Sequence, residues 1–170
     1  MLMGVNNMNL GIYVDTIVDN ELLGPISLMI NDGLQSKTIS DASVFYDGIG
    51  HNPYPVVYGM FNSTDLWNFD GNLITMSRST SSKSLNIVNN FSMFYYYGWE
   101  KTKNIIDLLK IANDKRVNII CKNEEDKKEL YRLTGKECVG ISDNFNDILD
   151  IISRCKNGRS KDSRNVCRKE

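Results

Sequence analysis

The sequence has little of what marks several large classes of protein. It contains one histidine, and its four cysteines are too far apart to form the close pairs typical of a zinc site. No apolar run approaches the roughly 20 residues that cross a membrane, and the start lacks the pattern of a signal peptide. We therefore expect a cytoplasmic protein with reduced thiols, no metal site and no membrane contact.

The glycine patterns of nucleotide-binding loops are also missing. The hydroxyl-rich run at residues 76–83 contains no glycine, so it is neither a P-loop nor a dinucleotide-binding fingerprint. Two interpretations remain for this run. It wraps a phosphate with its backbone amides while Arg78 and Lys83 supply charge, or it is a capped, solvated loop. The sequence names no cofactor.

The composition is that of one globular domain. Of the 170 residues, 41% are apolar and 24% are charged, and the chain is too short for two full nucleotide-binding lobes. We expect a lead-in at residues 1–9, one domain at 10–154 and a flexible basic tail at 155–170. Residues 154–170 hold seven basic and two acidic side chains, but no aromatic residue is interleaved, so we do not expect nucleic-acid binding.

Short apolar segments alternate with helical patterns along the chain. Strands separated by helices are joined by crossovers, so they should lie parallel in one sheet. The sequence thus predicts an α/β fold, a three-layer Rossmann-like domain whose mostly parallel sheet of six or seven strands has helices on both faces. The predicted strands are residues 10–17, 41–47, 56–61, 73–76, 91–97, 117–121 and 137–141.

Capping residues suggest where several helices begin and end. Asp19 or Asn20 is expected to cap the first helix, in whose first turn Pro25 fits. Gly135 is a typical stop for a charged helix, and Asp143 or Asn144 is expected to cap the last one. The remaining helical segments are expected around residues 66–69, within 78–90 and at 101–114.

Ligands of an open parallel sheet bind beyond the carboxyl ends of its strands. This rule points to Asp15 after the first strand and to His51 in the loop after the second. Asp15 could hold a sugar hydroxyl, a ribose or a metal, or simply cap a turn. A histidine in a polar loop is a common general base. We take Asp15 and His51 as the candidate catalytic residues, and the sequence leaves open whether the protein is an enzyme.

The same rule places candidate ligand contacts after the other strands. Ser63 and Thr64 follow the third strand, and Tyr97 ends the fifth, where its ring could stack on a base or a sugar. Trp99 has the same potential, whereas Trp67 is expected to pack in the core. The hydroxyl-rich run and residues 98–100 lie at the same edge.

Two further stretches, residues 119–124 and 139–146, resemble a Rossmann-like lobe of the two-lobed, GT-B type glycosyltransferases. In each, a short strand leads into a polar loop and a helix. The resemblance implies that four residues lie near a nucleotide-sugar cleft: Lys122, Glu124, Ser142 and Asn144. It also implies that a homodimer or another protein supplies the wall that the second lobe provides in that family.

The overall composition, rich in Asn, Ile, Lys and Ser, and the sequence of residues 59–69 are similar to those of small uncharacterised proteins of tailed bacteriophages. This likeness implies a role in the cytoplasm of an infected bacterium and no particular chemistry. Two hypotheses follow from the sequence. One is a domain that binds a nucleotide or nucleotide-sugar, and the other is a non-catalytic module that engages a host or phage protein.

Overall fold

The computed structural model describes residues 8–18, 21–100 and 104–162, and for 156–162 it describes the backbone alone. In this part of the chain seven strands form one sheet in the order β3-β2-β1-β4-β5-β6-β7, and every neighbouring pair is parallel. The predicted parallel α/β fold is confirmed. The strands are β1 (Met8–Ile17), β2 (Ile39–Ile49), β3 (Gly59–Asn62), β4 (Gly71–Thr75), β5 (Phe91–Tyr97), β6 (Val117–Cys121) and β7 (Gly140–Ile141).

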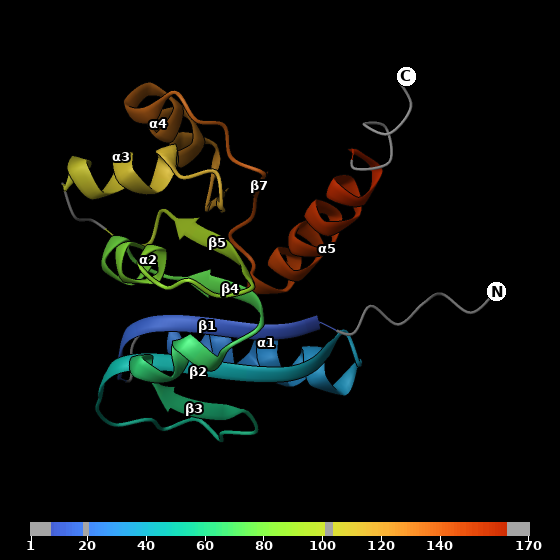
Figure 1. The fold of residues 1–170 in the computed structure, drawn as a ribbon. Coiled ribbons are helices and arrows are strands. Elements are labelled where there is room, and N and C mark those ends of the chain that lie inside the picture. The colour runs from blue at the N-terminus through green and yellow to red at the C-terminus, as the bar shows by residue number, and fades with distance from the viewer. Residues whose placement is uncertain (1–7, 19–20, 101–103, 163–170) are drawn as a thin grey trace.

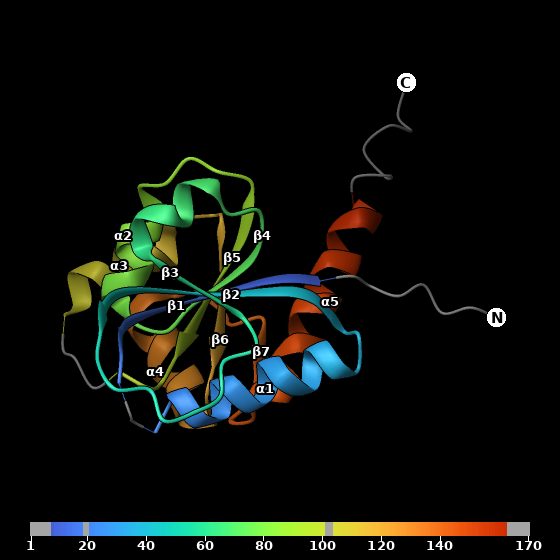
Figure 2. The same ribbon diagram turned by 90° about the horizontal axis from the view of Figure 1, so that it is seen from below.

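Helices cover both faces of the sheet and make the fold a three-layer, Rossmann-like one (Figures 1 and 2). One face packs against α1 and α5, and the other packs against α2, α3 and α4. A short 3₁₀ helix, η1, joins the second group beside β1 and β2. The helices are α1 (Leu23–Gln35), η1 (Ser63–Asn68), α2 (Arg78–Leu85), α3 (Ile105–Asn113), α4 (Glu124–Thr134) and α5 (Phe145–Asp162).

Strand β5 shows how the sequence pattern produces these layers. Phe94 and Tyr96 face the core under α1 and α5, while Met93, Tyr95 and Tyr97 face the core under α3 and α4. Successive side chains of a strand point to opposite faces, so a strand covered on both sides is apolar throughout. All five side chains are buried, which explains why this segment is a continuous apolar run and has no alternation of polar residues.

Several helix boundaries follow the predicted capping chemistry. Gly135 ends α4 in the left-handed conformation, with φ +70°, as a helix stop requires. Asn144 caps α5, because its Oδ1 accepts a hydrogen bond from Asn146 N at 3.0 Å. Pro25 lies in the first turn of α1, where its missing N–H costs no hydrogen bond.

Other boundaries differ from the prediction. The N-cap of α1 is Leu22, and the expected caps Asp19 and Asn20 lie outside the described residues. Helix α3 begins after Asn104, whose Oδ1 accepts from Ile106 N and Asp107 N, so its regular part starts four residues later than predicted. Strands β3 and β7 are shorter at their starts because both lie at sheet edges, with a neighbour on one side only.

The last helix is longer than the sequence suggested. Helix α5 runs to Asp162, so its backbone continues beyond residue 154, where we had placed the end of the domain. Residues 163–170 lie outside the described part of the chain. Within the described residues, no helix is both long enough and apolar enough to cross a membrane.

Candidate functional site

The strand order reverses direction between β1 and β4. From β1 the chain builds outward through β2 to β3, then returns to place β4 on the other side of β1. The connections on either side of this point leave in opposite directions, so they separate and leave a crevice at the carboxyl edge of the sheet. A binding site is therefore expected where β1 and β4 end.

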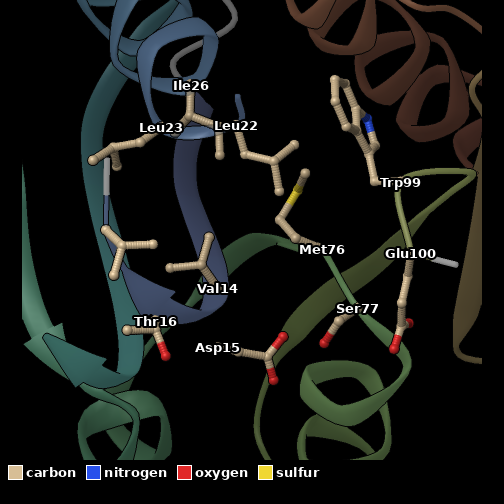
Figure 3. A pocket seen from close by; sticks show the side chains of 11 residues that line it. Val14, Asp15, Thr16, Leu22, Leu23, Ile26, Met76, Ser77, Trp99 and Glu100 are labelled. Atoms are coloured by element: carbon tan, nitrogen blue, oxygen red, sulfur yellow. The ribbon is translucent and has the colours of Figure 1, made fainter. Parts of the chain in front are cut away.

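A cavity of about 270 Å³ lies at this point (Figure 3). Oxygen-bearing side chains, those of Thr16, Asp15, Ser77 and Glu100, lie along one side of it, and apolar side chains lie along the other. The cavity thus has a polar side suited to hydroxyl groups and an apolar side suited to a ring. Its lining residues are Val14, Asp15, Thr16, Val18, Leu22, Leu23, Ile26, Met76, Ser77, Trp99 and Glu100.

Asp15 reaches the cavity because β1 is longer than its partner. The pairing of β1 with β4 ends at Tyr13 and Thr75, and Met76 N donates one more hydrogen bond to Tyr13 O at 3.1 Å. Beyond that point β1 has no β4 residue beside it. The side chains of Asp15 and Thr16 are exposed there, whereas Val14 and Ile17 on either side of them are buried.

The hydroxyl-rich run forms the start of α2. Ser77 Oγ accepts a hydrogen bond from Thr80 N at 3.1 Å, and Thr80 Oγ1 accepts one from Ser77 N at 3.0 Å. This reciprocal pair is a capping box. Ser81 and Ser84 are buried against the sheet, so the interpretation as a solvated loop is wrong, whereas the predicted cap is present.

Glu100 connects the end of β5 to the start of α2. Its Oε2 accepts a hydrogen bond from Arg78 N at 2.6 Å. The side chain of Arg78 is 6% exposed, and its Nη1 donates to Asn104 O at 2.6 Å. These two bonds hold the chain after β5 against the first turn of α2 and position the Glu100 carboxylate on the cavity wall.

Trp99 forms another part of the wall and is held by its neighbours. Its ring centroid lies 6.2 Å from that of Tyr96 and 5.9 Å from that of Phe145. Lys122 Nζ lies 3.9 Å from the centroid of the Trp99 ring, which is the geometry of a cation–π contact. Lys122 therefore touches a residue of the cavity wall, although it does not line the cavity itself.

Of the residues that the sequence singled out individually as site candidates, Asp15 and Trp99 line the cavity. His51 is exposed in the loop after β2. Glu124 lies in the first turn of α4 and pairs with Lys127 at 3.8 Å. Ser142 is buried, and its Oγ donates to Asn144 O at 2.8 Å. Ser142 and Asn144 therefore contact each other, but neither they nor His51 and Glu124 line the cavity.

Tyr97 is not available for stacking on a ligand. Its ring is buried under α3 and α4, and its hydroxyl donates to Glu129 Oε2 at 3.2 Å. Burial, together with the Glu129 carboxylate, raises the pKa of Tyr97 to about 12. Of the two aromatic candidates at this strand end, Trp99 is the one on the cavity wall.

Ser63 and Thr64 begin η1 on the other face of the sheet. Thr64 N and Thr64 Oγ1 both donate to Asn62 Oδ1, the N-cap of η1. Ser63 belongs to a polar cluster in which Tyr13 and Lys83 each donate to Asp47 at 2.6 Å. Burial alone would raise the pKa of Asp47, but the hydrogen bonds from Lys83, Ser63 and Tyr13 outweigh it and lower the pKa.

The Asp47 cluster makes stability depend on pH. A carboxyl whose pKa is lower in the folded state stabilises the fold above its unfolded pKa, and this contribution is lost as pH falls through the folded pKa. We expect Asp47→Asn to lower the melting temperature at pH 7 and to have a smaller effect near pH 3. Thermal unfolding monitored by circular dichroism across this range measures the difference. An effect equal at both pH values would contradict the assignment.

Several cavity residues were not identified individually from the sequence. Residues 77–82 and 98–100 were placed at the carboxyl edge, but Ser77 and Glu100 were not distinguished from their neighbours. The apolar residues Leu22 and Ile26 carried only the signal of a helix with a buried side. The missing information was the strand order, which brings the ends of β1, β4 and β5 together.

Comparisons with known proteins found no matching family model, no similar curated protein and no similar solved structure. Among the described residues, no group of three histidine, cysteine, aspartate or glutamate side chains is arranged to hold a metal ion. The cavity and its chemistry therefore carry the functional argument.

Proposed function

We propose that this domain binds a nucleotide or nucleotide-sugar in the cavity between β1 and β4, through the nucleoside or sugar part of the ligand. The observation that carries this proposal is the division of the cavity into a side with oxygen atoms and an apolar side (Figure 3). A nucleoside has the same division, with hydroxyl groups on its ribose and a flat ring as its base. The position at the switch point of the sheet agrees with this ligand class.

The carboxylates define how the hydroxyl groups would be held. Asp15 and Glu100 carry acceptor oxygens at the polar side, and ionised carboxylates accept strong hydrogen bonds from hydroxyl donors. The apolar side, with Leu22, Ile26 and Met76, would receive the base or the apolar face of a sugar ring. Trp99 adds an aromatic surface to the apolar side.

Sugar transfer would require more than this domain. The proposal of a glycosyltransferase-like activity is supported by the order of elements in the Rossmann-like fold, and fold alone does not define chemistry. In such a reaction Asp15, which lines the cavity, would accept a proton from a hydroxyl group. A second copy of the chain or a partner protein would close the cavity.

Trp99 provides a direct test of ligand binding. The chain has two tryptophans, and Trp67 is 57% exposed in η1 and does not line the cavity. In a Trp67→Phe variant the fluorescence reports on Trp99 alone. We expect uridine, adenosine or their diphosphate sugars to change this fluorescence saturably and to raise the melting temperature by mass action. If none of them does either, the proposal fails.

A second candidate function is a non-catalytic module that engages a protein partner, such as one from a phage or its host. The observation that favours it is a set of exposed apolar side chains near the edge strand β3: Ile49, Val57 and Phe61 are 62%, 59% and 42% exposed. An edge strand such as β3, which pairs with a neighbour on one side only, is a common place for another chain to bind. This candidate would be favoured by two results together. The parent does not bind nucleosides, and the Phe61→Ser variant loses the self-association or partner binding that the parent shows.

A further inference from the structure

The end of β5 brings a carboxylate to the first turn of α2. Glu100 Oε2 accepts a hydrogen bond from Arg78 N at 2.6 Å, and the same residue lines the cavity. The first N–H groups of a helix carry partial positive charge and often bind an anion such as a phosphate. In this chain, a carboxylate of the protein itself takes the place of that anion.

The side chain of Arg78 is committed elsewhere. It is 6% exposed, its Nη1 donates to Asn104 O at 2.6 Å, and its guanidinium lies 6.0 Å from the centroid of the Tyr97 ring. Neither of these partners lines the cavity. The cavity wall in the described chain therefore carries the two carboxylates of Asp15 and Glu100, and no lysine or arginine.

We propose that Glu100 is a specificity-determining residue, which keeps phosphate groups away from the first turn of α2 and selects the uncharged, hydroxyl-bearing part of the ligand. The proposal rests on the function proposed above, because it concerns the ligand of the same cavity. A phosphate and the Glu100 carboxylate repel each other and compete for the N–H of Arg78. A ribose or sugar hydroxyl instead donates a hydrogen bond to Glu100 and leaves that bond in place.

Inorganic phosphate tests the role of Glu100 without any nucleoside. We expect Glu100→Ala to bind phosphate about tenfold more tightly than the parent, with the largest amide shift at Arg78 in NMR spectra. Glu125→Gln is the matched control, because it removes an exposed carboxylate from the first turn of α4 that does not line the cavity. Glu100→Gln keeps an oxygen acceptor without the charge and replaces Glu100→Ala if that variant does not fold. If the Glu100 variant binds phosphate with the same affinity as the parent, the proposal is overturned.

A second comparison separates this proposal from the proposed function. We expect the parent to bind uridine about tenfold more tightly than uridine monophosphate, and the Glu100 variant to reduce that ratio. A parent that binds both equally overturns the role of Glu100 and leaves the proposed function standing. A parent that binds neither ends the proposed function, while the phosphate titration still decides whether Glu100 blocks an anion.

Discussion

Replacing Asp15 with asparagine is expected to weaken nucleoside binding by about tenfold to a hundredfold. A hydrogen bond to a charged group contributes about 1.5 to 3 kcal/mol, and each 1.4 kcal/mol changes the dissociation constant by a factor of about ten. Asp15 is the carboxylate at the end of β1 on the polar side of the cavity, and its exposure means that the substitution should leave the fold intact.

Fluorescence titration of uridine in the Trp67→Phe background measures this effect. Asp32→Asn is a suitable control, because Asp32 is an exposed acid on α1 that does not line the cavity. The control should bind uridine like the parent. If Asp15→Asn also binds like the parent, while the parent does bind uridine, the ligand lies elsewhere or uses other acceptors.

Gly71→Ala is expected to lower the free energy of unfolding by about 3 kcal/mol or more. Gly71 begins β4 with φ +142°, a conformation that side chains rarely adopt. A Cβ atom there would lie 2.6 Å from the backbone oxygen of Asn9 on β1. Because backbone cannot move aside as a flexible side chain can, the substitution should force the start of β4 away from β1, at the end of these strands opposite the cavity.

Gly135→Ala is the matched control for this prediction. Gly135 also has a positive φ, +70°, but a Cβ atom there would have no other atom within 4 Å. Gly135→Ala should therefore lower the free energy of unfolding by about 1 kcal/mol, which is the cost of placing alanine in the left-handed conformation. Urea unfolding of the two variants measures both losses. Equal losses would contradict the assignment of the Gly71 effect to contact with β1.

The fold was largely predictable, because its signals are local. The alternation of short apolar segments with helical patterns predicted a parallel sheet covered on both faces, and Gly135 marked the end of α4. Two boundaries differed from the prediction for different reasons. Helix α3 starts at Ile105 because Asn104 caps it, a local signal that the prediction missed. Strand β7 is short because it lies at an edge of the sheet, which the periodicity of the sequence does not reveal.

The candidate site was predicted in part, and the rule that placed it at the carboxyl edge was sufficient for Asp15. The choice of His51 and Tyr97 was not supported by their positions, since His51 is exposed but does not line the cavity and Tyr97 is buried beneath helices. A residue type and a place at a strand end do not say which way the side chain points. Tyr97 faces α3 and α4 because the alternation along β5 sends it there.

The sequence by itself determined how many strands and helices form and in what order they follow, because spacing and capping act over a few residues. The tertiary structure alone decided that β4 lies beside β1, that Glu100 reaches the amide of Arg78, and that Lys122 covers Trp99. A helical crossover can carry the chain to either side of a strand, so the neighbour of β1 depends on how the whole core packs. The cavity exists at that junction, and for this reason it appears only once the chain is folded.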